Sequence, residues 1–373
     1  MLADSGGLAW MQDLVSTAMR ARDLTLAGEY ATILTALRWG SPWYPRLRDG
    51  SVVPVPVQPP DVFLTIPKLI HDIEQFEYLQ RHGVLGSEFT PIIKEYERVI
   101  DRLVPRGTNV RVPLDPEEHR PIRHVYNRIV HIRRTSRVPR ALSGKWDPAA
   151  VESQYLDKPP GLVVVDDFLS GEALQNVRLF CLESTVWSAN RYAHGRLGAF
   201  FHDGFNCPLL LQIAEELRQA LPRVIGDRFP LRQLWGFKNG QSLPADSTNH
   251  ADFAAVNVNF WITPNEANLD DTSGGLVVYD IDAPLSWDFN TYNGRTDFIK
   301  PFLRRRDAGS VTIPYRQNRA IIFNSDLFHA TAGLRFRPGY ENRRVNVTCF
   351  TGIGRMTFTT TTCRAKIRRV AWA

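Results

Sequence analysis

Two residues that could bind one metal ion stand two positions apart in the segment "STNHADFAAVNVNFW". His250 and Asp252 precede a stretch in which apolar and polar residues alternate, which is typical of a β-strand. In extended backbone, residues i and i+2 point to the same face, so this imidazole and this carboxylate could share one ion. Taken alone, the pattern more often marks a polar strand end.

Two residues further along the chain have the types that such a site needs. His329 follows the apolar stretch 320–323, and a histidine just past a buried strand can reach into the mouth of a barrel. Taken alone, it is more often an ordinary core or rim histidine.

Arg344 shares one face of a predicted strand with Asn346 and Thr348. Burying an arginine is costly unless it meets a carboxylate, which its planar head binds in bidentate fashion. The alternative is an exposed edge strand.

The combination of these residues is more specific than any of them alone. Two histidines and one carboxylate form the facial ligand set of non-haem Fe(II) oxygenases, which leaves coordination positions open. We therefore predict that His250, Asp252 and His329 bind a metal ion and are catalytic. Arg344 would then bind an acid-bearing cosubstrate.

With these residues identified, the chain from about residue 155 to 360 resembles the 2-oxoglutarate/Fe(II)-dependent dioxygenase superfamily. The prolyl-hydroxylase-like and phytanoyl-CoA-hydroxylase-like branches are the most similar. The family's distal His and Arg-x-Ser pattern falls on His329 and 344–346, with Asn346 where the family often has Ser. A glycine-rich loop of the family falls on 274–277. The resemblance leaves the first 140 residues unexplained.

The resemblance implies an α+β fold whose core is a double-stranded β-helix, or jelly roll, with supporting helices. It implies that the metal is Fe(II) and that 2-oxoglutarate and O2 are cosubstrates, with the C5 carboxylate of 2-oxoglutarate on Arg344. The implied reaction hydroxylates an unactivated C–H bond and converts 2-oxoglutarate to succinate and CO2. Halogenases of the family have Gly or Ala in place of Asp252, so the aspartate favours hydroxylation.

Several neighbouring positions leave alternatives open. Arg343 and Arg344 face opposite sides of a strand, and we choose Arg344 because it lies on the polar face with Asn346, a second predicted cofactor-binding residue. Asn257 and Asn259 are predicted to line the cosubstrate site, and the alternative is the outer face of their strand.

The elements that position these residues fall into two predicted domains. Residues 1–145 are expected to form a mainly α-helical domain, and 155–373 are expected to form the oxygenase domain, with a linker before it. The second region reads as a strand and two helices followed mostly by short strands, which is typical of a sandwich or barrel backed by helices. Within the first region we expect two helices in 10–38 that separate near Gly28, a proline-rich connector at 51–60, and helices near 67–82 and 88–104.

Two further segments bear on the substrate. Residues 119–145 hold eight Lys or Arg and no Asp or Glu, which predicts a solvated basic face or, alternatively, a docking surface for an acidic peptide or nucleic acid. The segment 280–309 is long for a strand connection, and such loops are often lids or binding loops. Its candidate substrate contacts are Trp287, Phe289, Tyr292 and Arg295, and a plain surface excursion is the alternative.

Composition excludes some classes and leaves the substrate open. The 373 residues are 43% hydrophobic and 23% charged with a formal charge of +6, and no apolar run is long enough to cross a membrane. The four cysteines form no C-x-x-C pair and are expected to be reduced thiols of a cytoplasmic protein. The predicted partner is a small-molecule or peptide substrate. The alternatives are a cupin-like metalloprotein without 2-oxoglutarate, a nucleic-acid-oxidising dioxygenase, and a non-enzymatic binding module.

Overall fold

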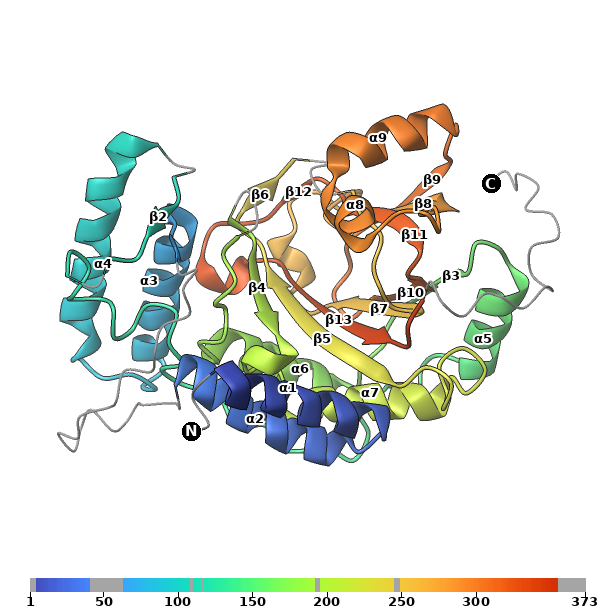
Figure 1. Ribbon diagram of the computed structural model, residues 1–373, viewed down its shortest axis with the longest axis horizontal. Coiled ribbons are helices and arrows are strands. Elements are labelled where there is room, and N and C mark those ends of the chain that lie inside the picture. The colour runs from blue at the N-terminus through green and yellow to red at the C-terminus, as the bar shows by residue number, and fades with distance from the viewer. Residues whose placement is uncertain are drawn as a thin grey trace.

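The computed structural model describes residues 5–40, 63–107, 110–115, 117–191, 195–244 and 249–354. The expected proline-rich connector at 51–60 and Cys363 lie outside these residues. The fold mixes α-helices with antiparallel sheets (Figure 1). The helices are α1 (Ser5–Arg20), α2 (Leu24–Trp39), α3 (Ile66–Arg81), α4 (Phe89–Leu103), α5 (Pro148–Asp157), α6 (Gly171–Glu183), α7 (Pro208–Ala220), α8 (Phe289–Gly294) and α9 (Thr296–Arg305).

Two sheets make up most of the strand content. The larger has the strand order β3-β10-β7-β13-β5-β4, and the smaller has the order β11-β8-β9. Every neighbouring pair in both sheets is antiparallel. Their strands are β3 (Leu162–Val165), β4 (Leu197–Phe200), β5 (Leu231–Lys238), β7 (Val256–Trp261), β8 (Leu276–Asp282), β9 (Ser310–Ile313), β10 (Ala320–Asn324), β11 (Leu327–Thr331) and β13 (Val345–Thr351). Two short hairpins add β1 (Phe63–Leu64) with β2 (Val112–Pro113) and β6 (Ser242–Leu243) with β12 (Leu334–Arg335).

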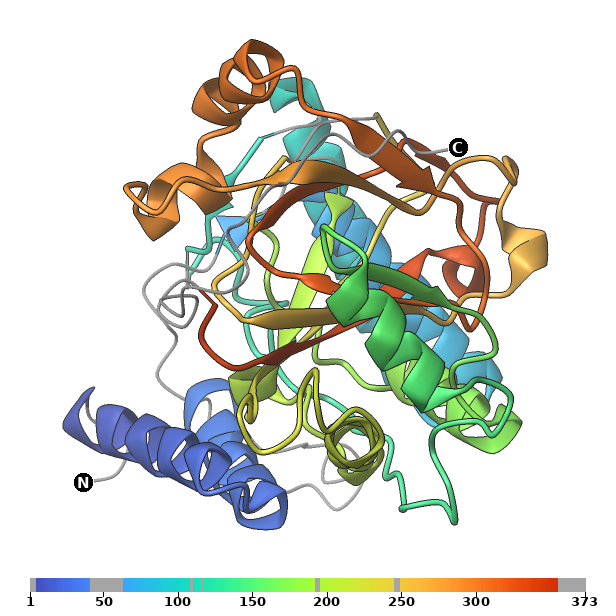
Figure 2. The ribbon, with the colours of Figure 1, turned by 90° about the vertical axis from the view of Figure 1, so that its right-hand side faces the viewer.

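The larger sheet has one apolar face, which α6 and α7 cover. Residues that pair across antiparallel strands point to the same side, so the strand register assigns each side chain to a face. The apolar face packs in one core with the helices (Figures 1 and 2). Its residues on the central strands include Leu234, Val258, Phe260, Val347 and Cys349.

The opposite face of the larger sheet carries polar and aromatic side chains. We call it the inner face because it faces the smaller sheet. Leu276 and Val278 of β8 share a second core with Ile321 and Phe323 of β10, which joins the two sheets. Figure 2 shows the smaller sheet on the side of the larger sheet that is away from α7. The inner face carries Trp235, Phe237, Asn257, Asn259, Trp261, Asn346, Thr348 and Phe350.

The N-terminal helices belong to two different cores. Helices α1 and α2 pack with α7 in the core beneath the larger sheet, whereas α3 and α4 form a separate core that also contains Tyr126, Leu182 and Tyr340. Figure 1 shows α3 and α4 beside the sheets and α1 and α2 beneath them. No helix within the described residues is both long enough and apolar enough to cross a bilayer.

Most of the helices expected in the first region are confirmed, with one correction. The helices near 67–82 and 88–104 are α3 and α4, and Gly83 has the positive φ of +69° that a helix C-terminus favours. The break between α1 and α2 is not at Gly28 but before Asp23, whose side chain accepts a hydrogen bond from Leu26 N. Gly28 lies inside α2, where a Cβ atom would be 2.7 Å from Cδ1 of Leu211. Glycine there permits close helix packing rather than a turn.

The segment expected as a linker before the second domain contains helix α5. Asp147 is its N-cap and accepts a hydrogen bond from Ala149 N, and Pro148 takes the first helical position, where a missing N–H costs nothing. The proposed division into 1–145 and 155–373 stays a prediction.

The basic segment 119–145 is built into the fold through its apolar side chains. Ile122 and Val125 belong to the core of α3 and α4, and Val138 belongs to the core of α1, α2 and α7. Arg133 pairs with Glu183 at 2.6 Å. Arg134, Arg137 and Arg140 are exposed, which agrees with the predicted solvated basic face at these three positions. Docking of an acidic peptide or nucleic acid on them stays a prediction.

Candidate metal centre

Backbone hydrogen bonds hold His250 and His329 side by side. The N–H of His250 donates to the carbonyl of His329 at 3.0 Å, and the N–H of His329 donates back at 2.8 Å. A third bond, from Asp252 N to Ser325 O at 3.0 Å, fixes the segment before β7 against the turn before β11. This isolated bridge therefore places a His-x-Asp segment and a distant histidine side by side.

The three predicted ligands converge on one point. Oδ2 of Asp252 lies 3.3 Å from Nε2 of His329, and Oδ1 of Asp252 lies 3.8 Å from Nε2 of His250. One ligand atom from each residue lies within 4.8 Å of the other two. Ligands at bond lengths of about 2.0–2.2 Å stand roughly 3 Å apart on a shared ion, so the spacing fits a divalent metal with little adjustment. Asp252 and His329 are buried and His250 is partly exposed, which leaves the centre an open side.

Hydrogen bonds orient two of these ligands. Nδ1 of His329 lies 3.0 Å from the carbonyl oxygen of Leu327, so it carries the proton and leaves Nε2 free for a metal. Asn257 Nδ2 donates to Oδ2 of Asp252 at 2.8 Å, and Asn293 Nδ2 donates to Oδ1 at 3.3 Å. Burial by itself would raise the pKa of Asp252. The neighbouring His329 and His250 together lower this pKa by more, so the net pKa lies below its ordinary value. The carboxylate is thus held ionised, as a metal ligand must be.

Arg344 is buried with only 2% of its surface exposed, and it points to the inner face. Its Nε donates to Gly274 O at 2.6 Å, its Nη1 to Asn346 Oδ1 at 3.1 Å and its Nη2 to Gly275 O at 3.3 Å. Its guanidinium carbon lies 5.4 Å from the centre of the Trp261 ring. Burial lowers its pKa to about 9.

No Asp or Glu within the described residues forms an ion pair with Arg344, since its partners there are neutral. A buried cation is stabilised when an anion pairs with it. Arg343 points to the other side of the strand, where its Nε donates to Glu74 Oε2 of α3 at 2.6 Å. The choice of Arg344 over Arg343 by strand parity therefore agrees with the orientations of the two side chains.

The predicted asparagines all lie on the inner face, but they contact different groups. Asn346 accepts from Arg344, Asn259 donates to Thr348 Oγ1 at 3.2 Å, and Asn257 orients Asp252. The buried Oδ1 atoms of Asn257 and Asn259 and the indole N–H of Trp261 have no hydrogen-bond partner among the described residues. Buried polar atoms of this kind require partners, so they fit a polar ligand between the metal centre and Arg344. Their predicted contact with the cosubstrate stays a prediction.

Sequence reasoning missed Asn293 and Arg196. Asn293 lies on α8, and its contact with Asp252 depends on how the 280–309 segment folds back over the site. Arg196 lies just before β4 and places its guanidinium carbon 3.8 Å from the centre of the inner-face Phe237 ring. Neither residue belongs to a motif, and only the register of distant strands and helices brings them to the centre.

The 280–309 segment is largely helical rather than an irregular loop. Of its four candidate substrate contacts, Tyr292 is buried and Phe289 is 45% exposed. Trp287 packs on Phe302, with ring centres 5.0 Å apart, and Arg295 pairs with Asp297 at the surface. Contact of these residues with a substrate stays a prediction.

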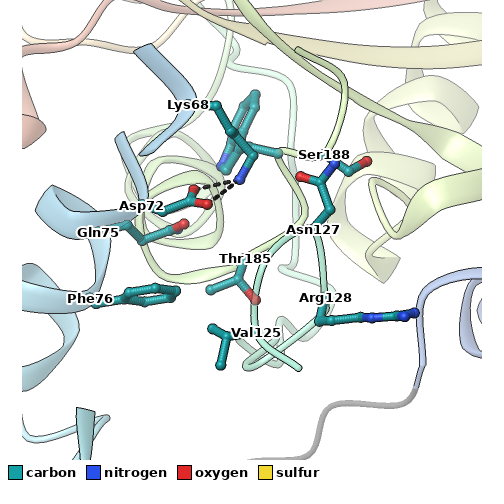
Figure 3. A pocket seen from close by; sticks show the side chains of 10 residues that line it. Lys68, Asp72, Gln75, Phe76, Val125, Asn127, Arg128, Thr185 and Ser188 are labelled. Carbon is teal, nitrogen blue, oxygen red and sulfur yellow. Dashed lines mark hydrogen bonds and ion pairs between the residues drawn. The ribbon is translucent and has the colours of Figure 1, made fainter. Parts of the chain in front are cut away.

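A separate pocket lies between α3 and the segments around 125–128 and 185–188 (Figure 3). Lys68 and Asp72 form an ion pair in its wall. Its lining includes none of the residues that we predict for the metal or cosubstrate.

Comparisons with known proteins give similar structures at low identity. No family model and no curated protein matches the chain. The chain is similar to the non-heme alpha ketoglutarate dependent carbocyclase SnoK from nogalamycin biosynthesis, with 10% identity, a TM-score of 0.40, and coverage of 58% of this chain and 87% of that chain. It is also similar to a Pseudomonas putida prolyl-4-hydroxylase, with 10% identity, a TM-score of 0.30, and coverage of 58% and 100%. A third is EctD from S. alaskensis, with 13% identity, a TM-score of 0.36, and coverage of 60% and 84%.

These structures include non-haem 2-oxoglutarate-dependent oxygenases, the same superfamily that the motifs resemble. At TM-scores of 0.40 and below, the likeness carries no argument about the reaction of this chain. The geometry of the site is therefore the basis for assigning a function.

Proposed function

We propose that this protein is an Fe(II)- and 2-oxoglutarate-dependent dioxygenase. The observation that supports it most is the pairing of one ligand set with one anion site. His250, Asp252 and His329 offer ligand atoms within 4.8 Å of one another, and Arg344 lies buried on the same inner face with no acidic partner among the described residues. A 2-His-1-carboxylate set with open positions favours Fe(II) oxygenase chemistry.

The two antiparallel sheets and their shared core support a double-stranded β-helix as the framework of this site. Such a framework places strand ends and inner-face side chains around one centre. The His-x-Asp segment meets β11 at His329, and Arg344 directly precedes β13.

The reaction that we propose adds one oxygen atom of O2 to an unactivated C–H bond of an organic substrate. The other oxygen atom goes to 2-oxoglutarate, which loses CO2 and becomes succinate, so atoms and electrons balance. Bound Fe(II) would supply the redox chemistry that activates O2. His250, Asp252 and His329 would bind it, and Arg344 would bind the C5 carboxylate of 2-oxoglutarate.

The residues of the chain itself would orient the reactants. Asn257 and Asn293 hold the Asp252 carboxylate in one orientation, and Leu327 fixes the tautomer of His329. The carbonyls of Gly274 and Gly275 hold the Arg344 head in place before an anion arrives. A preorganised charged group of this kind loses little freedom when its ligand binds.

The proposal is tested by measuring succinate release with Fe(II), 2-oxoglutarate and O2 over a panel of peptides and organic acids. A substrate should speed the release and gain the mass of one oxygen atom. A metalloprotein that does not use 2-oxoglutarate would release no succinate in any of these mixtures.

A further inference from the structure

A cluster of aromatic rings begins directly beside the predicted metal ligands. Phe253 follows Asp252 in the chain, and its ring is stacked with that of Phe350, with ring centres 5.3 Å apart. Phe350 on β13 pairs with Asn257 on β7, and Asn257 donates to the carboxylate of Asp252. The chain itself, the strand register and one hydrogen bond therefore place these two rings next to the metal centre.

The cluster continues across the inner face through Trp235 of β5. Trp235 pairs with Thr348 on β13, so its indole points to the inner face. The centre of the indole lies 4.5 Å from the ring centre of Phe350 and 5.9 Å from that of Phe253. The ring centre of Phe200 on β4 lies 5.4 Å from the indole. Strands β4, β5 and β13 and the segment that carries Asp252 thus contribute rings to one aromatic surface.

The inner face is closed at one end and open at the end that carries these rings. Trp261 is fully buried in the core that joins the two sheets, together with Leu276 of β8 and Ile321 of β10. Trp235 and Phe253, in contrast, are partly exposed. A side chain on the inner face cannot reach solvent through its own sheet. The exposed parts of these two rings therefore face solvent on the side of the larger sheet that carries the metal ligands.

The orientation of the indole leaves stacking contacts to a ligand. Four rings surround Trp235, and their planes are inclined to it by 52° for Phe253, 64° for Phe350, 69° for Phe200 and 89° for Phe237. None of these four rings is parallel to the indole. Aromatic rings that stack with an offset stabilise each other beyond the burial of their apolar area. A planar ring is therefore the group that gains most from contact with the exposed part of Trp235.

Helix α8 extends the aromatic surface on the other side of Phe253. Phe289 is 45% exposed, and its ring centre lies 6.5 Å from that of Phe253. Two hydrogen bonds hold α8 at the metal centre, from Ala251 N to Tyr292 O at 2.9 Å and from Asn293 Nδ2 to Ala251 O at 2.8 Å. Ala251 stands between two predicted ligands, so these bonds keep the exposed ring of Phe289 close to the centre.

We propose that Trp235, Phe253 and Phe289 form the substrate subsite, and that the substrate is a small molecule with a planar aromatic body. This rests on the function proposed above and narrows its organic substrate to an aromatic one. Exposed apolar surface beside a few polar groups is typical of small-molecule sites. Because the rings adjoin the predicted ligands, a molecule that lies on them has one edge at the metal centre.

The test compares 2-naphthol with its saturated analogue, trans-decahydro-2-naphthol. Both carry one hydroxyl group on the same carbon skeleton, and only 2-naphthol is planar. Equilibrium dialysis against the full chain with Fe(II) and 2-oxoglutarate, in the absence of oxygen, gives the dissociation constant of each probe. We expect 2-naphthol to bind about three- to tenfold more tightly, because only a planar ring can stack on Trp235.

Three variants locate the bound probe. Trp235→Leu should weaken 2-naphthol by about three- to tenfold and its analogue by less, so that the preference is lost, whereas Trp235→Phe should keep part of it. Trp10→Leu is the matched control. Trp10 on α1 is 55% exposed, and α1 packs beneath the other face of the larger sheet, so neither constant should change (Figure 1). Thermal unfolding confirms that each variant is folded.

Equal affinity of the wild type for the two probes overturns the proposal, because the subsite would then take an aliphatic body as readily as an aromatic one. Failure to bind either probe also overturns it. So does binding of 2-naphthol that Trp235→Leu leaves unchanged, since the probe would then lie elsewhere. Absence of succinate release from wild type would contradict the proposed function separately, because probe binding is measured without turnover.

Discussion

Asn257 donates a 2.8 Å hydrogen bond to Oδ2 of Asp252, the same oxygen that lies 3.3 Å from Nε2 of His329. Asn257 lies on β7, and Asp252 lies in the segment just before this strand. The asparagine side chain therefore contacts a predicted metal ligand that precedes it closely in the sequence. Asp252 is buried, and its carboxylate would have several orientations without this bond and that of Asn293. The contact gives Asn257 a role in holding the ligand set.

Asn257→Leu should weaken Fe(II) binding by about 10–100-fold, because a leucine of similar size cannot donate to Asp252. Anaerobic titration of the full chain with Fe(II) measures the change. Asn259→Leu is the matched control, since Asn259 donates to Thr348 on the same face and does not contact a predicted ligand. Equal loss of Fe(II) affinity in both variants would show that Asn257 acts only through general packing.

Arg344 and Arg343 should respond differently to the same substitution. Arg344→Met removes a buried cation that we expect to pair with 2-oxoglutarate, at a cost of about 2–5 kcal/mol of binding. The 2-oxoglutarate concentration for half-maximal succinate release should therefore rise by more than about 30-fold.

Arg343→Met should leave that concentration unchanged and instead lower the free energy of unfolding by roughly 1–3 kcal/mol, because Glu74 loses its charged partner. Urea unfolding measures this change. The opposite pattern, with the 2-oxoglutarate requirement raised by Arg343→Met alone, would mean that the two arginines are assigned the wrong way round.

The stability of the protein should fall below about pH 6.5 through His71. Burial, with Lys238, Arg343 and Lys68 nearby, holds the pKa of this fully buried imidazole well below its ordinary value. The unfolded chain takes up a proton below about pH 6.5 that the folded chain does not, so the free energy of unfolding drops by up to about 1.4 kcal/mol per pH unit. Above that pH the contribution is complete.

His71→Gln removes this titration while offering an amide beside Asp72, which lies 2.9 Å from Nδ1 of His71. Urea unfolding of wild type and variant from pH 7 to pH 5 isolates the effect, because His124, His131 and His202, whose pKa values are also lowered by burial, remain in both proteins. Parallel pH profiles would show that His71 does not titrate as described.

Short-range patterns correctly predicted which side chains share a face near the candidate centre. Strand alternation placed Arg344 and Asn346 on one face and Arg343 on the other, and the contacts of Arg344 with Asn346 and of Arg343 with Glu74 agree. The start of α6 is also set by a local contact, since Ser170 is its N-cap and accepts a hydrogen bond from Ala173 N.

Features that depend on contacts between distant segments could not be predicted. Gly28 looked like a helix break, but its lack of a side chain serves packing against Leu211, a residue far away in the sequence. Arg196 and Asn293 reach the site through a sheet edge and a helix whose positions no periodicity encodes. The signals for α5, an Asp N-cap before a proline, were present in the sequence and were outweighed by the linker-like composition around them.

The central claim is that His250, Asp252 and His329 hold the iron that drives oxidation of 2-oxoglutarate. The most direct test measures succinate formed from 2-oxoglutarate by the full chain with Fe(II) and O2, for wild type and for His250→Ala and His329→Ala, with circular dichroism as a check of folding. We predict slow succinate formation by wild type even without a substrate, and none by either folded variant. Succinate formed equally by a histidine variant, or none by wild type with Fe(II), would contradict the claim.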